Sequence, residues 1–185
     1  MAYLEEIEHP KREWIRGEEI MLTPAGTGHN IVGMNLARII SSYLHGKRCK
    51  VFYETKVVFD EENKFIPDLV VVCDRSKIKE NAIYGAPDLV IEILSFSTRK
   101  RDIGVKKEAY GTFGVREYWI VNPRDKSIEV YHLRDGSLEL DDVYAVPQKW
   151  EEETMTDKER EEVSLHLKVS LYDDLVVDVR EVFEE

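Results

Sequence analysis

Glu92 lies in the most apolar stretch of the chain, residues 87–94 (P-D-L-V-I-E-I-L). Burying an isolated carboxylate costs free energy unless a cation, a metal ion or a second carboxylate that shares its proton compensates it. A second acid, Asp68, opens a similar apolar run over residues 67–73, and 92 − 68 = 24 positions separate the two acids. That interval suits two neighbouring strands. The sequence therefore predicts that Asp68 and Glu92 work together.

Two acids share one divalent cation only if their oxygens converge, because Mg²⁺ binds oxygen at about 2.0 to 2.1 Å. On adjacent strands the Cβ atoms of Asp68 and Glu92 are expected about 5 Å apart, which permits this. Asp88 precedes Glu92 by four positions on the same strand, about 13 Å away, and cannot easily share that ion. Pro-Asp also commonly opens a strand out of a turn, an interpretation that we favour for Asp88 and that stays open for Asp68.

The composition indicates one globular domain. The chain has 185 residues, of which 43% are apolar and 34% charged, and no apolar run approaches the roughly 20 residues of a membrane span. The N-terminus carries no basic segment followed by an apolar one, so we expect a cytoplasmic protein. Cys49 and Cys73 have no C-x-x-C spacing and no companion histidine cluster, which argues against a disulfide framework and against a structural zinc site. We interpret both as packing residues.

The formal charge of −11 argues against nonspecific attraction to nucleic acid, because that attraction comes from Lys and Arg. Segment 99–107 (R-K-R-D-I-G-V-K-K) nevertheless holds five basic residues against one acid. It predicts either a local basic edge, with Arg99, Lys100 and Arg101 as candidate nucleic-acid ligands, or a solvated helix face.

The hydrophobic pattern predicts a mixed β-sheet flanked by helices, an α/β (α+β mixed) fold, with an N-terminal hairpin. We expect the hairpin over residues 13–22 with its turn near Arg16-Gly17, an amphipathic helix over 29–44, and a second helix over 102–113 that ends at Gly114. Strands are expected at 49–59, 66–73, 88–94, 116–121, 127–133 and about 138–146. Residues 151–162 fit a loop or short helix, 163–171 alternate like a strand, and 175–183 could form either element.

One set of motifs extends over most of the chain. It consists of Pro67-Asp68, Glu92-x-Leu94, Ser95-x-Ser97-Thr98, Arg101-Asp102, Lys106, Tyr110 and Gly114-Val115-x-Glu117-Tyr118-Trp119. The set resembles the Uma-two-type restriction endonucleases, a branch of the PD-(D/E)xK nuclease superfamily, from about Gly17 through Pro123. The resemblance implies a restriction-endonuclease-like core and a metal-dependent endonuclease that hydrolyses phosphodiester bonds, in which Asp68 and Glu92 hold Mg²⁺ or Mn²⁺. It also implies a nucleic-acid substrate, with DNA expected, and a homodimer that cuts two strands with two-fold symmetry.

The chain departs from the superfamily pattern at Leu94, where the usual lysine lies two residues after the glutamate. Lys106 is the candidate replacement. At about 100° per residue, Ile103, Tyr110 and Phe113 define an apolar helix face whose centre lies roughly 25° from Lys106 and about 75° from Lys107. Lys106 is thus expected to point inward, toward the carboxylates, although a lysine stem that runs along the core and ends in water is the alternative.

Three further residues are accessory candidates. His29 opens the first helix, where the family also places a histidine, and could ligate metal, orient a phosphate or move a proton. Glu54 is either a third carboxylate of the site or a residue on the polar face of an alternating strand. Tyr110 is expected in the core with its hydroxyl near the site.

Two other functions remain open at this point. A noncatalytic nucleic-acid-binding or assembly module could retain the fold after losing the usual lysine. A hydrolase of the glycosidase type, with Glu92 as acid and Asp68 as partner, has too few aromatic residues nearby to stack on sugars.

Overall fold

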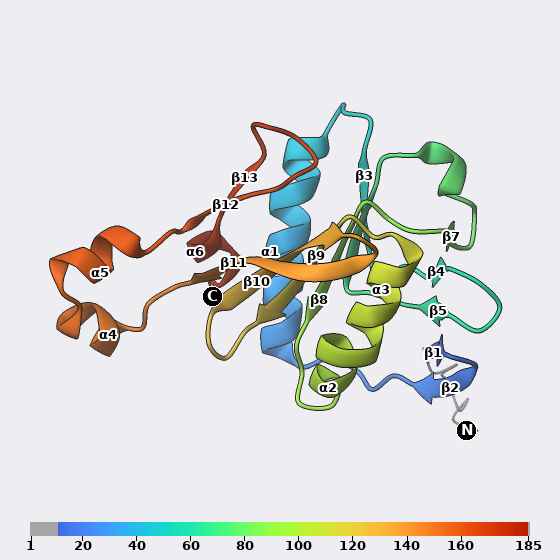
Figure 1. Cartoon of the computed structure of the whole chain (residues 1–185), viewed down its shortest axis with the longest axis horizontal. Coiled ribbons are helices and arrows are strands. Elements are labelled where there is room, and N and C mark those ends of the chain that lie inside the picture. Colours follow the sequence, from blue (N-terminus) through green and yellow to red (C-terminus); the bar gives the residue numbers. More distant parts are fainter. Residues whose placement is uncertain (1–10, 185) are drawn as a thin grey trace, which may run out of the picture.

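A computed structural model describes residues 11–184 of the chain (Figure 1). Its strands are β1 Arg12–Ile15, β2 Glu18–Met21, β3 Lys50–Tyr53, β4 Val57–Val58, β5 Lys64–Phe65, β6 Leu69–Val72, β7 Ile83–Tyr84, β8 Leu89–Ile93, β9 Glu117–Asn122, β10 Ser127–Arg134, β11 Ser137–Ala145, β12 His166–Lys168 and β13 Val176–Asp178. Its helical segments are α1 Thr27–Leu44, η1 Arg75–Lys77, α2 Arg99–Arg101, η2 Asp102–Lys106, α3 Lys107–Phe113, α4 Lys149–Thr154, α5 Asp157–Glu162 and α6 Val179–Val182.

A six-stranded mixed sheet forms the centre of the molecule, in the order β11-β10-β9-β8-β6-β3. Strand β8 pairs antiparallel with β6 and parallel with β9. Both β6 and β8 are buried along their whole length, as expected of apolar strands that are covered on both faces. The predicted neighbouring strands for Asp68 and Glu92 are therefore β6 and β8, two adjacent interior strands of this sheet.

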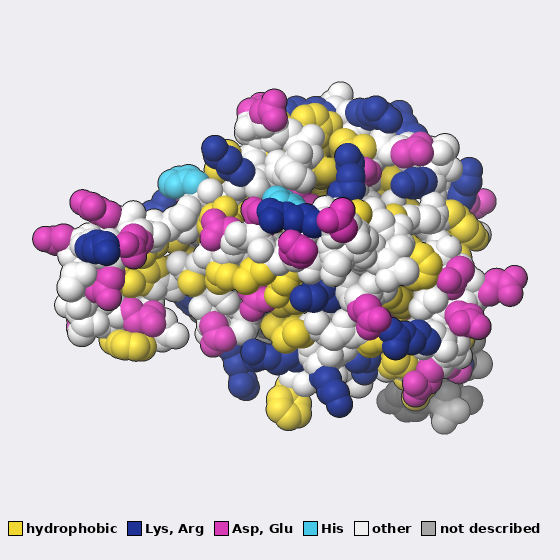
Figure 2. Space-filling model, viewed as in Figure 1, with side chains coloured by type: hydrophobic (Ala, Val, Ile, Leu, Met, Phe, Trp, Pro, Cys, Tyr) yellow, Lys and Arg dark blue, Asp and Glu magenta, His cyan; other side chains and the backbone are white. Residues whose placement is uncertain are grey.

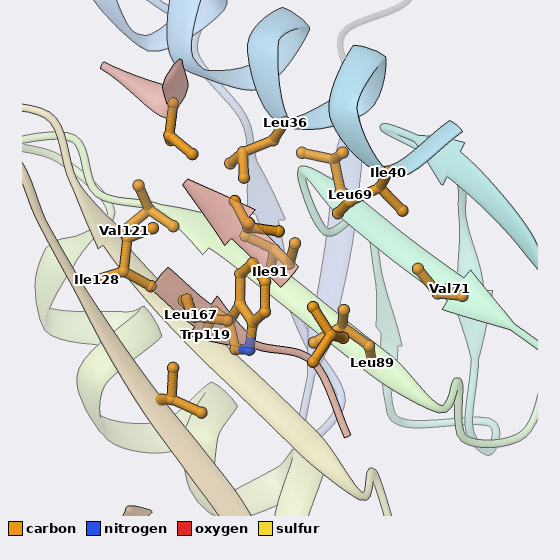
Figure 3. Close-up of a cluster of buried hydrophobic side chains, with 14 of the residues drawn as sticks. Leu36, Ile40, Leu69, Val71, Leu89, Ile91, Trp119, Val121, Ile128 and Leu167 are labelled. Atoms are coloured by element: carbon orange, nitrogen blue, oxygen red, sulfur yellow. The ribbon is translucent and has the colours of Figure 1, made fainter. Parts of the chain in front are cut away.

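One face of this sheet packs against α1. Figure 3 shows Leu36 and Ile40 of the helix above Leu69, Ile91 and Trp119 of the sheet. The C-terminal strand pair β12–β13 and helix α6 contribute to the same apolar cluster. The apolar residues of α1 recur with the period of a helix, so they form one face, and this face packs against the sheet.

The other face is covered by α3 and by a second sheet, of five short strands in the order β2-β1-β5-β4-β7. Tyr110 packs between Phe65 and Tyr118 in this layer. Side chains alternate between the two faces along β8, so Val90 and Glu92 lie on the α3 side while Leu89, Ile91 and Ile93 lie on the α1 side. A buried acid thus faces the layer between the two sheets.

Several predicted elements differ in their bounds. The hairpin turns at Arg16 and Gly17, which both have positive φ, as predicted. The strand expected over 49–59 is wrong, because the chain leaves the main sheet at Glu54, whose φ is +44°, and enters the second sheet at β4. The second helix starts at Arg99 rather than 102, and Gly114 ends it in the left-handed conformation as predicted.

The interpretation of the two cysteines as separate packing residues is also wrong. Cys49 and Cys73 form a disulfide. They lie just beyond β3 and β6, where the register pairs Lys50 with Val72, so the antiparallel pairing brings their side chains together. Within residues 11–184, no helix has the length and apolar character needed to cross a membrane.

Candidate active site

The β6–β8 pairing brings Asp68 and Glu92 together. Leu69 pairs with Ile91, so continuing the register by one residue places Asp68 opposite Glu92. Asp68 Oδ2 accepts a hydrogen bond from the Ile93 backbone N–H at 2.6 Å, and Oδ1 lies 3.2 Å from Nε2 of His29. The first residue before β6, the end of β8 and the first turn of α1 thus meet at one end of the sheet.

Lys106 extends from the helical layer onto Glu92. Its Nζ lies 2.6 Å from Glu92 Oε1, and the two side chains are only 4% and 5% exposed. The same ammonium contacts Glu13 Oε1 of β1 at 2.9 Å and lies 3.8 Å from Asp102 Oδ1. A buried lysine is therefore surrounded by three carboxylates from three separate segments.

Lys106 is the last residue of a π-helical turn, Asp102–Lys106, inserted in the helix. The wider i→i+5 turn changes the angular position of each side chain relative to a regular α-helix. Asp102 and Lys106 are buried, whereas Ile103, which was expected on the apolar face, is 39% exposed. The prediction for Ile103 is wrong for this reason, and the inward direction expected of Lys106 is the one observed.

Burial and charge act in opposite directions within this cluster. Burial raises the pKa of Glu92 well above its usual value, against the opposing effect of the Lys106 ammonium. Burial likewise raises the pKa of Asp102. Burial alone would lower the pKa of Lys106, but the charges of Glu92, Glu13 and Asp102 outweigh it and raise that pKa. Lys106 is thus protonated at every physiological pH, while Glu92 resists ionisation.

Tyr110 and His29 contact the two acids directly. The Tyr110 hydroxyl donates a 2.6 Å hydrogen bond to Glu92 Oε1. Burial, and next the charge of Glu92, raises the pKa of Tyr110, so the phenol keeps its proton. Burial lowers the pKa of His29, but the hydrogen bond and charge of Asp68 outweigh burial and raise it. His29 is therefore suited to hold a proton beside Asp68.

The remaining candidates lie apart from Glu92. Asp88, at the other end of β8, accepts a hydrogen bond from the Cys73 backbone N–H at 2.6 Å and pairs with Arg116, which fits a residue that opens a strand. Glu54 pairs with Lys11, and its backbone N–H donates to the Asp68 carbonyl at 2.9 Å. Arg99 and Lys100 are exposed on the first turn of the helix.

Glu13 is a member of the cluster that sequence reasoning missed. It is 1% exposed and also accepts a 2.7 Å hydrogen bond from the Ile66 backbone N–H. The available signal was its alternation with Ile15, since residues two apart on a strand share one face. An acid on the apolar face of a short strand could have been recognised as a buried carboxylate.

The donor set fits a divalent cation of the magnesium type. Glu13, Glu92 and Asp102 surround the single charge of Lys106, and because burial favours the protonated forms of Glu92 and Asp102, a bound cation would take the place of a proton on Glu92. Asp68 and Glu92 offer the oxygen ligands that Mg²⁺ prefers. Within residues 11–184, no three His, Cys, Asp or Glu side chains form a ready metal-ligating group. Mg²⁺ is commonly held by one or two carboxylates and retains several waters, so two ligands suffice.

The mixed sheet carries a buried Glu92, a half-buried Asp68 and a buried lysine at one end, and three comparisons with known proteins show what the chain is similar to. The Uma2 family model, described as "Putative restriction endonuclease", matches residues 2–167. Two uncharacterized proteins of Synechocystis sp. (strain ATCC 27184 / PCC 6803 / Kazusa), slr1290 and sll1609, are each 27% identical to the chain, over 71% and 69% of it and over 70% and 75% of their own lengths.

The fold comparison agrees with the sequence comparison. The crystal structure of "a putative nuclease belonging to DUF820" from Anabaena variabilis ATCC 29413 superposes with a TM-score of 0.72 at 21% identity, over 94% of this chain and 90% of that one. The predicted mixed α+β nuclease-like fold is therefore confirmed. The chain belongs to the Uma2 family.

Proposed function

We propose that this protein is a metal-dependent nuclease that hydrolyses phosphodiester bonds of nucleic acid, with DNA as the expected substrate. In this proposal Asp68 and Glu92 hold Mg²⁺ or Mn²⁺, and Lys106 is the lysine of the site. The observation that carries the proposal is the buried contact of 2.6 Å between Lys106 Nζ and Glu92 Oε1, beside Asp68 on the adjoining strand.

A bound divalent cation would polarise the scissile phosphate and lower the pKa of an attacking water. The side chains have separate tasks around it. Lys106 remains protonated, so it cannot accept a proton from water. Its charge instead fixes the orientation of Glu92 and offsets negative charge that develops on the phosphate.

Tyr110 and Glu13 are positioning residues in this proposal. The Tyr110 hydroxyl holds Glu92 Oε1, and Glu13 holds the Lys106 ammonium from the opposite sheet. Glu92 Oε2 accepts no hydrogen bond from residues 11–184, which leaves it available as a ligand. His29, beside Asp68 and with a raised pKa, is the group suited to exchange a proton near neutral pH.

A noncatalytic nucleic-acid-binding or assembly module is the second candidate. Leu94 stands where the superfamily's lysine is usual, and the Lys106 ammonium already neutralises part of the charge of Glu92. Such a module would bind nucleic acid without cleaving it.

A homodimer is expected for the nuclease, and light scattering coupled to gel filtration would measure the oligomeric state.

Isothermal titration with Mn²⁺ tests the metal site. Wild-type protein should bind, and Asp68→Asn and Glu92→Gln should each lose binding, since both substitutions keep the side-chain shape but remove a negative charge. Asp88→Asn is the matched control, because Asp88 lies directly before β8, at the end of the strand opposite to Glu92. Unchanged Mn²⁺ binding in both site variants would reject the assignment. Cleavage of plasmid DNA and of RNA with Mg²⁺ then separates the nuclease from the noncatalytic module.

A further inference from the structure

Phe96 is the most exposed of the large hydrophobic side chains among the described residues, at 98%. It lies between the end of β8 and the start of α2, directly after the strand that carries Glu92. Single exposed hydrophobic residues are common and need no explanation. Three further observations suggest a ligand-binding role for Phe96.

The turn that presents Phe96 is held by its neighbours. Ser95 Oγ lies 3.1 Å from Ser97 Oγ and 3.0 Å from Thr98 Oγ1, and it accepts a 3.2 Å hydrogen bond from the Thr98 backbone N–H. The Arg99 N–H donates to the Ser95 carbonyl at 3.1 Å. The ring is therefore displayed on a fixed turn, which lowers the entropy cost of using it to bind a ligand.

Positive charge follows Phe96 immediately. Arg99 and Lys100 are exposed on the next helical turn, and Nε of Arg101 is buried without a hydrogen-bond partner among residues 11–184. Figure 2 shows Lys and Arg side chains at the edge of the molecule where α2 lies in Figure 1, with an exposed hydrophobic group among them. On a protein with a net charge of −11, this local arrangement attracts a polyanion.

The turn also lies at the same end of the sheet as the candidate active site. Glu92 is close to the C-terminal end of β8, where Asp68 meets the Ile93 N–H and the first turn of α1 contributes His29. A polynucleotide that contacted Phe96 would therefore lie at the end of the sheet where Asp68 and Glu92 are found.

We propose that Phe96 stacks on an unpaired base while Arg99 and Lys100 bind the flanking phosphates, so that the preferred ligand is single-stranded or locally opened nucleic acid. This inference rests on the proposed function and specifies its substrate. A phenyl ring has no hydrogen-bonding group, so its stacking tolerates any base, and a base-paired duplex covers the base faces that the ring needs. An exposed aromatic residue beside basic residues is the combination that single-strand binding uses.

Fluorescence anisotropy in EDTA tests this without cleavage, using single-stranded DNA, single-stranded RNA and the corresponding duplex DNA. Phe96→Ala should weaken single-strand binding at least about five-fold, the effect of losing one stacked base. Phe96→Trp should restore it, and Trp150→Ala, which removes an aromatic side chain that is 62% exposed on α4, should leave it unchanged. Quenching of a 2-aminopurine base in the single strand should be strong in wild type and lost in Phe96→Ala.

Equal single-strand affinity of wild type and Phe96→Ala overturns the inference, as does a wild type that binds only duplex or no nucleic acid. Cleavage assays distinguish this failure from failure of the proposed function. Cleavage that persists in Phe96→Ala with unchanged affinity removes the stacking role and leaves the nuclease intact. Phe96-dependent binding without any cleavage supports the stacking role and favours the noncatalytic module.

Discussion

The ammonium of Lys106 lies 2.6 Å from Oε1 of Glu92, although 106 − 92 = 14 positions separate the two residues along the chain. Lys106, on the helical segment that follows β8, thus supplies a positive charge that Leu94, at the usual lysine position, does not. Because both side chains are almost completely buried, their interaction is weakly screened by solvent, and changes to either residue should have measurable consequences.

Lys106→Ala should destabilise the protein by about 3 to 5 kcal/mol, since it leaves buried carboxylates without their cation. Addition of Mn²⁺ should return part of the lost stability by replacing that charge. Lys107→Ala should cost about 1 kcal/mol or less, because the Lys107 ammonium only lies 4.3 Å from the centre of the Tyr131 ring. Urea unfolding in EDTA and in Mn²⁺ measures these differences.

In a cleavage assay Lys106→Ala should lose most of the cleavage rate and Lys107→Ala little of it. The reverse order would contradict the assignment of Lys106 to the site.

Glu92→Gln should stabilise the metal-free protein increasingly as pH rises. In the folded state the pKa of Glu92 is raised, so between its ordinary value of about 4.3 and the raised value the unfolded chain is ionised while the folded chain resists ionisation. Wild-type stability therefore falls as pH rises through this interval, by about 1.4 kcal/mol per pH unit. Glutamine keeps an oxygen that can accept hydrogen bonds from Tyr110 and Lys106.

Denaturant unfolding from pH 4 to pH 8 in EDTA measures this effect, with the exposed Glu18→Gln as control. Mn²⁺ affinity of the wild type should rise over the same range, because protons compete with the metal for Glu92. A stability difference that does not change with pH would show that Glu92 ionises normally in the folded protein.

Reversal of Arg99, Lys100 and Arg101 to glutamate should abolish nucleic-acid binding. Wild-type affinity for a single strand should fall about 20-fold between 50 and 200 mM salt if three phosphates are neutralised. The same reversal at Lys149, Lys158 and Arg160, all exposed on α4 and α5, changes the net charge equally and should reduce binding much less. Equal losses in the two triple variants would mean that only net charge matters. Since the first three residues form the first helical turn, circular dichroism must accompany the binding measurement.

Reduction of the Cys49–Cys73 disulfide should lower stability by up to about 3.5 kcal/mol, the chain-entropy contribution of a loop with a sequence separation of 24 residues. Cys49→Ser/Cys73→Ser should match the reduced wild type and be insensitive to dithiothreitol. Alkylation before and after reduction, followed by mass spectrometry, measures the bond directly. Free thiols in the purified, unreduced protein would contradict the pairing.

Elements with a long, regular hydrophobic period were predictable from the sequence. The amphipathic pattern of α1 and the continuous apolar runs of β6 and β8 located the core, and the 24-residue interval correctly placed Asp68 and Glu92 on neighbouring strands. The glycines at positions 17 and 114 marked a turn and a helix end, because both adopt the positive φ that glycine tolerates.

Features that depend on tertiary contacts were not predictable in the same way. The π-helical turn has no local signature, so a phase of 100° per residue placed Ile103 inside although it is exposed. The disulfide depends on the register of β3 and β6, which two isolated cysteines do not disclose. Strands of two residues, such as β4, β5 and β7, are too short to have a period.

The contact between Glu13 and Lys106 joins residues 93 positions apart, from β1 in the small sheet to the end of the π-helical turn. During synthesis the N-terminal hairpin leaves the ribosome long before the residue that it must contact. At about 5 to 20 residues per second, Glu13 waits for several seconds before Lys106 is made. The Glu13–Lys106 contact therefore cannot form until residue 106 has been made, and until then Glu13 remains hydrated and carries no desolvation cost.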